Sequence, residues 1–559
     1  MLRSLADSRA LRRTLTGAAL VALLSPAGAR AASFRLSDGQ AFSDVAGIGT
    51  FNQPKFYLPV FSPDGRTVLY AHDADTDDAF ELWRVRTGGG TPVRVSGLLP
   101  SGSAAFGFHF TPNGQRILYR ARQDDADALE LYSVPAGAPT GSWTKLNESL
   151  APDSGIVDLG VSPDSAAVAY SVWRDPGART RELWTAATDG GERHLVVSVP
   201  DSAEIRWERV TSSFARFVYI ADTLVDDRFE LWSVPTAGGT PVKLNGVLTG
   251  EGDVQSFDLA PGGARVAYVA DQQTNDVFEA YTVPVAGGGP VKVSAALPAG
   301  SDVSAVVMLA GGQRLIYLVV AEATGQAELW GASVFGGDAA RLHPALGPDR
   351  NLAGLAVAPD GSRVAYVADV EQNDRYELYT VPAAGGVPVK LNGAMTAGGD
   401  VATDLPVVFT PDSSRVLYVA DQLLDGRREL FGAPAAGGTA LRLNRTLAAP
   451  GEWQVVGFQP TADSSRIAYV LRSRPSAVAA WTEQLYSVPV TAGASTRLDG
   501  PTSAGGDLFE IPVVPPVGSA RVLYLADQDD DEQFELYVGD ACLFCDGFEA
   551  GSTVRWAQP

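Results

Sequence analysis

The chain has 559 residues, of which 45% are hydrophobic, and it contains 59 Gly and 36 Pro. This composition favours a large, β-rich globular protein that reverses direction often. The formal net charge of −22 at pH 7 argues against nucleic acid and anionic membranes as partners, because both would repel such a chain.

The first 31 residues are predicted to form a secretory signal peptide. A start rich in arginine precedes an apolar run from Leu15 to Leu24, and Ala-Arg-Ala at 29–31 offers a small-residue cleavage site. The run is too short to span a bilayer, and no later stretch approaches the roughly 20 apolar residues that a span needs. We therefore expect Sec-type export to the periplasm or the medium, and a mature protein that begins near Ala32 and has no transmembrane segment.

One pattern recurs along the rest of the chain. Its plainest copies are FSPDGRTVLYAHDADTDDAFELWRV at 61–85, VAPDGSRVAYVADVEQNDRYELYTV at 357–381 and FTPDSSRVLYVADQLLDGRRELFGA at 409–433. Successive copies lie 49 to 55 residues apart, as counted from a tyrosine that all ten share. These tyrosines are Tyr70, Tyr119, Tyr170, Tyr219, Tyr268, Tyr317, Tyr366, Tyr418, Tyr469 and Tyr524.

Each copy is predicted to form four short strands. In the seventh copy these lie near 352–357, 363–368, 376–381 and 388–391, and they are joined by PDG, an acidic loop and PAAGG. One such sheet cannot cover its own apolar faces, so neighbouring sheets must pack. The sequence therefore predicts an all-β fold, a β-propeller of about ten four-stranded blades. A single ring is favoured over two smaller propellers, because no linker interrupts the repeats.

Three parts are predicted: a signal peptide at 1–31, the propeller at 32–540 and a C-terminal tail at 541–559. The tenth copy has no fourth strand of its own before the tail, and the mature N-terminus offers SFRLS at 33–37 in its place. We therefore expect the N-terminal strand to pair in the sheet of Tyr524 and to close the propeller.

The recurring PDG-x-R-[IV]-x-Y and ELY segments resemble the WD40-like repeats of the TolB propeller family across 34–540. The resemblance implies a propeller in a periplasmic or secreted setting, but the family hosts varied functions and does not specify one. The chain has no room for the separate N-terminal α/β domain of TolB itself, which argues against a Tol–Pal role.

Motifs typical of catalysis are missing. No G-x-S-x-G elbow occurs, and nothing after the repeats is long enough for an α/β-hydrolase. The repeats are too alike to expose a pocket of singular polar residues, which an enzyme usually has. The sequence thus predicts a protein that is not an enzyme. The four histidines occupy different repeat positions, which argues against a histidine metal site or triad; they are His72, His109, His194 and His343.

Acidic residues are concentrated in the loops between the second and third strands. Two loops place carboxylates at positions 1, 3, 5 and 9, and calcium, which takes six to eight oxygens, is the cofactor that this spacing suggests. The spacing resembles the calcium loops of integrin α-subunit propellers. The residues are Asp73, Asp75, Asp77 and Glu81 in the first copy and Asp527, Asp529, Asp531 and Glu535 in the tenth.

A structural role is the alternative for these loops, and we expect it for most copies. There the first Asp caps the hairpin turn, and the Glu begins the next strand and pairs with a nearby Arg or Lys. Copies that keep only this outer pair have Asp222 with Glu230, Asp271 with Glu279, Asp369 with Glu377, and Asp421 with Glu429.

A second acidic set begins the predicted first strands. Taken singly, each member can be a turn residue at a strand start, but together they predict a negative face that attracts cations or a basic partner. The set is Asp253, Asp302, Asp400, Glu452 and Asp507. The third copy departs from this acidity with Arg174, Arg179 and Arg181, through drift or as a partner-specific patch.

The predicted function follows from these features. We expect an exported, non-catalytic scaffold that binds a protein, peptide or glycan through its acidic face. The alternative is a propeller enzyme of the lyase or glycosidase type that uses paired carboxylates on that face. Cys542 and Cys545 form a C-x-x-C pair in the tail, which predicts a local disulfide in an oxidising compartment.

Overall fold

The computed structural model describes residues 32–35, 59–72, 79–174, 181–199, 203–347, 349–446, 451–476, 478–500, 508, 521–526 and 535–540. Within these residues the chain is all β, with 39 strands and no helix. A helix long and apolar enough to cross a membrane is accordingly not found among them.

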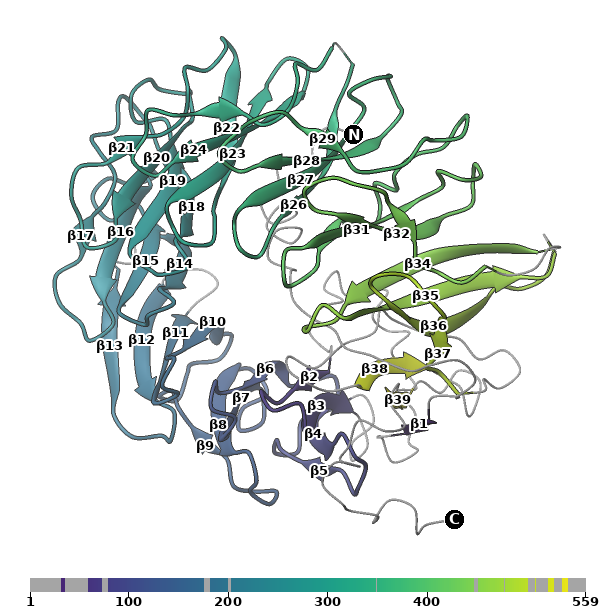
Figure 1. Cartoon of the computed structure of the whole chain (residues 1–559). Helices are drawn as coiled ribbons and strands as arrows, with labels where there is room; N and C mark the ends of the chain where they lie inside the picture. The colour runs from purple at the N-terminus through teal and green to yellow at the C-terminus, as the bar shows by residue number, and fades with distance from the viewer. Residues whose placement is uncertain are drawn as a thin grey trace. The chain divides into compact units, whose positions relative to one another are not determined.

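Ten antiparallel sheets follow one another along the chain (Figure 1). Nine of them contain four strands, each paired with the next in sequence, and the last contains three. The sheets belong to two compact units. Unit 1 holds the described residues of Val95–Leu391 with Ala435–Gly437, and unit 2 holds those of Ala18–Arg94, Asn392–Pro434 and Gly438–Pro559.

Unit 1 contains six sheets. In pairing order they are β6 (Phe106–Phe110), β7 (Arg116–Ala121), β8 (Glu130–Pro135), β9 (Thr144–Lys145); β10 (Gly155–Val161), β11 (Ala167–Trp173), β12 (Arg181–Ala187), β13 (Arg193–Ser198); β14 (Ile205–Val210), β15 (Arg216–Ala221), β16 (Glu230–Pro235), β17 (Val242–Lys243); β18 (Val254–Leu259), β19 (Arg265–Ala270), β20 (Glu279–Pro284), β21 (Val291–Lys292); β22 (Ser301–Met308), β23 (Arg314–Ala321), β24 (Ala327–Ser333), β25 (Ala340–Arg341); β26 (Leu352–Val357), β27 (Arg363–Ala368), β28 (Glu377–Pro382) and β29 (Val389–Lys390).

Unit 2 contains four sheets. In pairing order they are β2 (Val60–Phe61), β3 (Thr67–His72), β4 (Glu81–Arg86), β5 (Val93–Arg94); β30 (Val408–Phe409), β31 (Arg415–Ala420), β32 (Glu429–Pro434), β33 (Leu441–Arg442); β34 (Glu452–Pro460), β35 (Arg466–Arg474), β36 (Thr482–Pro489), β37 (Thr496–Arg497); and the three-stranded sheet of β38 (Arg521–Ala526), β39 (Glu535–Asp540) and β1 (Ala32–Arg35).

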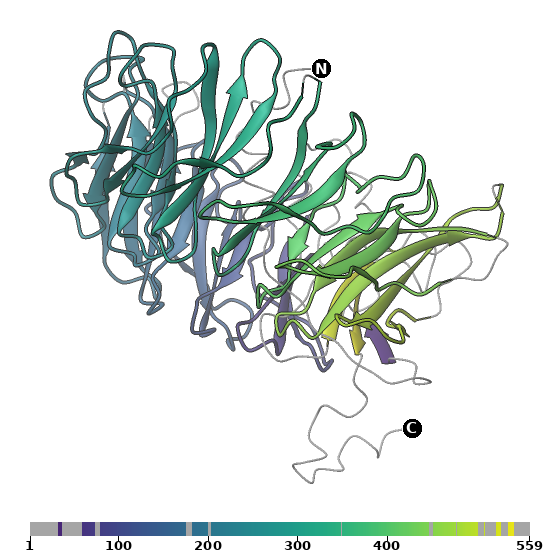
Figure 2. The ribbon, with the colours of Figure 1, turned by 45° about the horizontal axis from the view of Figure 1, so that its top comes forward.

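Turn residues explain why the strands reverse where they do. Between β10 and β11, Asp164 Oδ1 accepts hydrogen bonds from the Ser162 hydroxyl at 2.5 Å and from the Ala166 N–H at 3.0 Å. Between β16 and β17, Gly239 has φ +132°, which a residue with a side chain rarely adopts. Because the strands of each sheet alternate in direction, such turns lie at one end of the sheet and the loop joining the second to the third strand lies at the other. Figure 2 shows the teal sheets of unit 1 side by side, with connections at both ends of their strands.

The core lies between successive sheets within each unit. Phe229 and Leu231 of the sheet β14–β17 pack with Val254 and Phe257 of the sheet β18–β21 in one buried cluster. In several copies the shared tyrosine stacks on an aromatic ring of the third strand, as Tyr268 does on Tyr281 with ring centroids 5.4 Å apart. Each sheet thus covers the face that its neighbour leaves apolar, which is how propeller blades are stabilised.

The predicted propeller-type all-β fold is confirmed. In the seventh copy the observed strands β26 to β29 agree with the predicted ones to within one or two residues. The N-terminal strand β1 pairs with β39, and Phe34 lies opposite Val538 in the sheet of Tyr524. In that sheet Leu508 bridges Ala526, where the first strand would lie. Closure of the propeller by β1, the choice of one ring or two, and the boundaries at 31 and 540 stay predictions.

Candidate functional site

The first Asp of the loop between second and third strands is bound to backbone amides. Asp271 accepts the N–H of Asp253 at 2.5 Å through Oδ1 and the N–H of Asp276 at 2.9 Å through Oδ2. One bond ties the loop to the start of the first strand, and the other closes the loop itself. The same arrangement joins Asp222 to Glu204 and Asp227, Asp369 to Asn351 and Asp374, and Asp421 to Asp400 and Gly426. The predicted capping role is confirmed for these copies.

The Glu that begins the third strand is buried and paired. Glu377 lies 2.9 Å from Lys390 Nζ on the fourth strand and accepts the Tyr379 hydroxyl at 3.2 Å. Burial raises the pKa of Tyr379, and the charge of Glu377 adds to this, so the hydroxyl stays a donor. Similar ion pairs join Glu130 to Lys145, Glu230 to Lys243, Glu279 to Lys292 and Glu429 to Arg442. These carboxylates stabilise the sheets.

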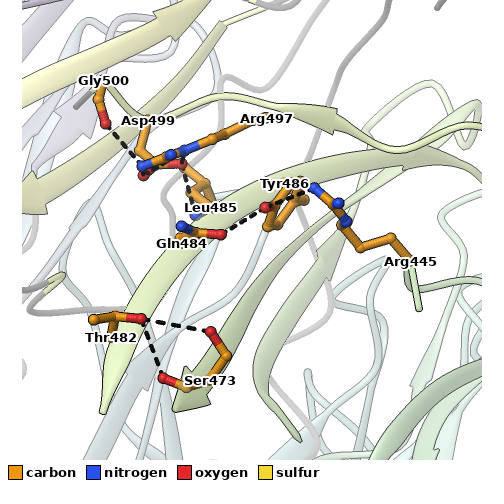
Figure 3. A network of polar contacts seen from close by, with 9 residues as sticks. All are labelled: Arg445, Ser473, Thr482, Gln484, Leu485, Tyr486, Arg497, Asp499 and Gly500. Carbon is orange, nitrogen blue, oxygen red and sulfur yellow. Dashed lines mark hydrogen bonds and ion pairs between the residues drawn. The ribbon is translucent and has the colours of Figure 1, made fainter. Parts of the chain in front are cut away.

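In the ninth copy the carboxylate that pairs with the basic residue of the fourth strand comes from Asp499, and the start of the third strand carries a neutral Gln484 (Figure 3). Every other copy has a glutamate in the place of Gln484. Gln484 accepts the Tyr486 hydroxyl at 2.6 Å, and Arg497 pairs instead with Asp499 at 2.6 Å. Asp499 also accepts the Leu485 N–H at 2.9 Å. Burial raises the pKa of Asp499, although Arg497 opposes the shift.

We expect this exchange to be reversible. The double variant Gln484→Glu with Asp499→Asn restores the arrangement of the other copies, so its free energy of unfolding should lie within about 1 kcal/mol of the wild type. Asp499→Asn alone removes the carboxylate from Arg497 and should cost about 1–3 kcal/mol. Urea unfolding of both variants checks this, and a double variant no more stable than the single one would contradict it.

The calcium prediction falls mostly outside the described residues. Asp73, Asp75, Asp77, Asp527, Asp529 and Asp531 all lie there. Of the remaining two, Glu81 is buried at the start of β4 and Glu535 begins β39. Calcium binding by these two loops therefore stays a prediction. The pair Cys542 and Cys545 also lies outside the described residues, so the disulfide stays a prediction as well.

One acidic group of another copy can hold a cation. Carboxylate oxygens of Asp222, Asp226 and Asp227 lie within 4.8 Å of one another, and Asp226 and Asp227 are exposed. Asp222 already accepts two backbone N–H groups, from Glu204 at 2.5 Å and from Asp227 at 3.2 Å. Its place in the loop is therefore fixed by the fold without an ion.

The second predicted acidic set joins neighbouring sheets. Asp253 accepts the N–H of Phe229, and Asp302 accepts that of Phe278, each at 2.7 Å and each from the preceding sheet. Burial raises the pKa of Asp253. The N–H of Asp400 is bound by Asp421, the exposed Glu452 pairs with Arg474, and Asp507 lies outside the described residues. Ligand binding by this set stays a prediction.

Exposed carboxylates gather on the loops between second and third strands in unit 1. Because successive sheets pack in register, these loops share one end of the unit. The loops at 122–128, 222–228, 271–277 and 369–375 each carry more acidic than basic residues. We call their exposed carboxylates the acidic face; they are Asp124, Asp125, Asp127, Asp226, Asp227, Asp276, Glu371 and Asp374.

One buried ion pair was missed by the sequence reasoning. Arg181 on β12 donates to both carboxylate oxygens of the buried Glu208 on β14, at 2.9 and 2.7 Å. At the corresponding positions of the following pair of sheets, Phe229 and Phe257 belong to one buried apolar cluster. Burial raises the pKa of Glu208, and Arg181 opposes the shift. An alignment of the ten copies would have found it, because Glu208 stands where the other copies have apolar residues.

Further polar residues that interrupt the repeat lie on neighbouring first strands. Arg209 on β14 pairs with Asp258 on β18 at 3.0 Å, and Asp258 accepts the Met308 N–H at 2.9 Å. The exposed Asp158 on β10 adds to the raised pKa of Glu208, and its N–H donates to Ser171 Oγ at 3.3 Å. The copies therefore depart from repeat symmetry here, contrary to the sequence-based expectation.

Comparisons with known proteins place the chain beside several propeller-type structures. Dipeptidyl peptidase 4 from Porphyromonas gingivalis is 14% identical, with 78% of this chain and 67% of that one covered and a TM-score of 0.44. An oligogalacturonate lyase in complex with manganese is 15% identical, with 73% and 98% covered and a TM-score of 0.36. A putative TolB from Agrobacterium tumefaciens is 15% identical, with 46% and 83% covered and a TM-score of 0.28.

No protein-family model matches the chain. No curated protein matches it either. The propeller assignment therefore rests on the sheets described above, and the resemblance to the TolB repeats remains one of repeat pattern.

The prediction that the protein is not an enzyme is contradicted by these comparisons, because a lyase and a peptidase stand among the similar structures. The reason given for it also fails on the chain's own residues. That prediction requires repeats too alike to build a pocket of singular polar residues, yet Glu208, Arg209 and Asp258 break the repeat on neighbouring first strands. Repeat similarity therefore does not exclude catalysis.

Proposed function

We propose that the protein is exported and binds a cationic polypeptide, a basic protein or peptide, through the acidic face of unit 1. The observation that carries this proposal is the exposed carboxylate surplus on four loops at one end of the unit. A surface lined by charges of one sign raises the local concentration of an oppositely charged ligand and speeds its association.

The loops are preorganised for such a role. Asp271 and Asp369 hold their loops through two backbone hydrogen bonds each. The exposed carboxylates of these loops therefore sit on a backbone that is already ordered, so binding costs little loop entropy. In the loop 122–128 Arg122 stands in the place of that Asp, and it donates instead to the carbonyl of Ala126 at 3.2 Å. The buried first Asp of such a loop holds the backbone, and the exposed carboxylates remain available to a ligand. This arrangement supports binding at the acidic face.

Oligolysine is a suitable probe of the acidic face. We expect the quadruple variant Asp124→Asn, Asp125→Asn, Asp226→Asn and Asp276→Asn to bind a blocked decalysine peptide at least roughly tenfold more weakly, because each exposed ion pair contributes about 0.2–1 kcal/mol. Isothermal titration at low and at physiological salt measures this, and the wild-type affinity should fall as salt rises.

A matched variant controls for overall charge. Asp164, Asp189, Asp338 and Asp360 are also exposed, but they lie in the turns at the opposite end of the sheets of unit 1. Changing these four to Asn alters the net charge equally and should leave oligolysine affinity within about twofold, since distant exposed charges are screened. Equal losses in both variants would show that net charge alone attracts the peptide, and the proposal would then be wrong.

Export is the second part of the proposal. The basic, apolar and small-residue segments at 1–31 support it. We expect N-terminal sequencing of the protein from the periplasmic or culture fraction to begin near Ala32. An intact Met1 on protein found in the cytosol alone would contradict export while leaving the binding proposal to its own test.

A further inference from the structure

The fourth strand of the sheet β10–β13 is longer than those of the other sheets. β13 runs over six residues, Arg193–Ser198, whereas β5, β9, β17, β21, β25, β29, β33 and β37 have two each and β1 has four. β13 is the end strand of its sheet, and no described strand pairs with its outer side (Figure 1). This sheet therefore offers a long free backbone edge.

The third copy lacks the residue that ends the other fourth strands early. In the fourth copy Asn245 Oδ1 accepts the N–H of Leu231 at 2.8 Å, and the chain then leaves for the next sheet. At the corresponding place the third copy has Val197, whose backbone pairs with Leu183. The β-favouring run Leu195–Val197 thus continues the strand instead of ending it.

The direction of the free backbone groups follows from the pairing. Ala187 donates its N–H to the carbonyl of Glu192 at 2.9 Å, so that carbonyl faces β12. Backbone groups alternate along an antiparallel strand, so the N–H and C=O of Arg193 and Leu195 point to the free edge. The bulge at Val196, where the register shifts, ends this regular stretch.

Side chains on this edge add a pattern that a partner can read. Arg193 and Leu195 are both exposed, Leu195 by 46%, whereas Val197 is buried in the core behind them. Residues two apart lie on the same face of a strand, so Arg193 and Leu195 stand side by side. A strand added antiparallel would place one of its side chains opposite each of them.

We propose that β13 binds an extended polypeptide as an added antiparallel strand, with an apolar side chain opposite Leu195 and a carboxylate opposite Arg193. Backbone hydrogen bonds supply the affinity, and the two side-chain pairs set the register. The partner chemistry, acidic and apolar, is the opposite of that of the ligand proposed for the acidic face. The two proposals therefore stand or fall separately.

A blocked heptapeptide, Thr-Val-Thr-Val-Thr-Glu-Thr, is the probe. Aligned antiparallel, its second valine lies opposite Leu195 and its glutamate opposite Arg193. We expect Arg193→Glu to weaken binding of this peptide roughly tenfold, because the attractive cross-strand pair of Arg193 with the peptide glutamate becomes a repulsive one. A second peptide with Lys in place of Glu should bind the Arg193→Glu variant more tightly than the wild type by a similar factor, because its lysine then faces a glutamate instead of an arginine. Arg193 is exposed, so the fold should be unaffected.

Leu195→Pro provides the backbone test. It removes an N–H that points away from the sheet, and proline is tolerated on an edge strand at such a position. We expect an unchanged unfolding temperature and at least a tenfold loss of peptide affinity, while oligolysine binding stays as in the wild type.

Two results would overturn the proposal. One is a peptide affinity indifferent to both Arg193→Glu and Leu195→Pro. The other is absence of peptide binding together with a dimer in sedimentation velocity that Leu195→Pro abolishes, because the edge would then be occupied by a second copy of this chain.

Discussion

Replacing Arg181 by leucine is expected to lower the free energy of unfolding by about 3–5 kcal/mol, because it leaves Glu208 buried without its cation. Arg181 donates to both oxygens of Glu208, and the two lie on adjacent sheets of unit 1. Urea unfolding followed by circular dichroism measures the change. Arg428→Leu is the matched control, because Arg428 holds the corresponding place in the eighth copy and pairs with the exposed Asp404; its loss should cost under about 1 kcal/mol.

The double variant Arg181→Phe with Glu208→Phe should recover most of this loss. It places apolar side chains at the positions where the following pair of sheets has Phe229 and Phe257, which belong to one buried apolar cluster. Replacing a buried ion pair by well-packed apolar residues is often neutral or stabilising by about 1–4 kcal/mol. A double variant as unstable as Arg181→Leu would contradict the assignment of the pair as a substitute for an apolar contact.

The pH dependence of Arg181→Leu gives a second readout. Burial raises the pKa of Glu208 above its unfolded value. The folded state thus favours the protonated form of Glu208. The stability that protonation of Glu208 contributes is complete at pH values below its pKa in the unfolded chain and is lost as pH rises through its pKa in the folded protein. Without Arg181 the upward shift grows, so the variant's deficit should be smaller near pH 4.5 than near pH 8. A deficit that is constant across this range would show that lost packing, rather than an unpaired charge, destabilises the variant.

Asp271→Ala is expected to lower the free energy of unfolding by about 2–4 kcal/mol, because it removes two charge-assisted hydrogen bonds and leaves both backbone N–H groups without this acceptor. Asp271 is buried, and it holds the N–H groups of Asp253 and Asp276. Asp276→Asn, an exposed change in the same loop, should cost under about 0.5 kcal/mol. Equal effects of the two changes would contradict the loop-organising role of the first Asp.

Much of the fold could be predicted from the sequence because each copy repeats its own turn signals. The PDG-type turns and paired glycines mark where strands end, and the ten in-phase tyrosines fix the number of sheets. The pairing of the N-terminal segment with the last sheet was predictable for the same reason, since β1 supplies the strand that the tenth copy lacks.

Contacts between copies were harder to predict. Arg181 and Glu208 lie in different copies, and each taken alone looks like an ordinary surface charge. The sequence predicts Asp253 and Asp302 as turn residues and as parts of a negative face, and the structure shows that each also accepts a backbone N–H from the preceding sheet. Such roles depend on which residues adjoin across two sheets, and no single copy contains that information.

The length of β13 was missed for a related reason. In eight of the other copies the fourth strand is a two-residue part of a short segment of the PVKLN type, and the third copy has RHLVVS at 193–198 instead. Taken within one copy, the segment 193–198 indicates only a variant fourth strand of ordinary length. Its exposed edge becomes evident only where the sheet order places it last.

Hydrogen exchange with and without oligolysine tests the binding claim most directly, because it locates the ligand on the chain. We expect protection at 122–128, 222–228, 271–277 and 369–375, the loops of the acidic face, that disappears at high salt. Protection confined to the turns at the opposite end of unit 1, or none at saturating peptide, would contradict binding at the acidic face.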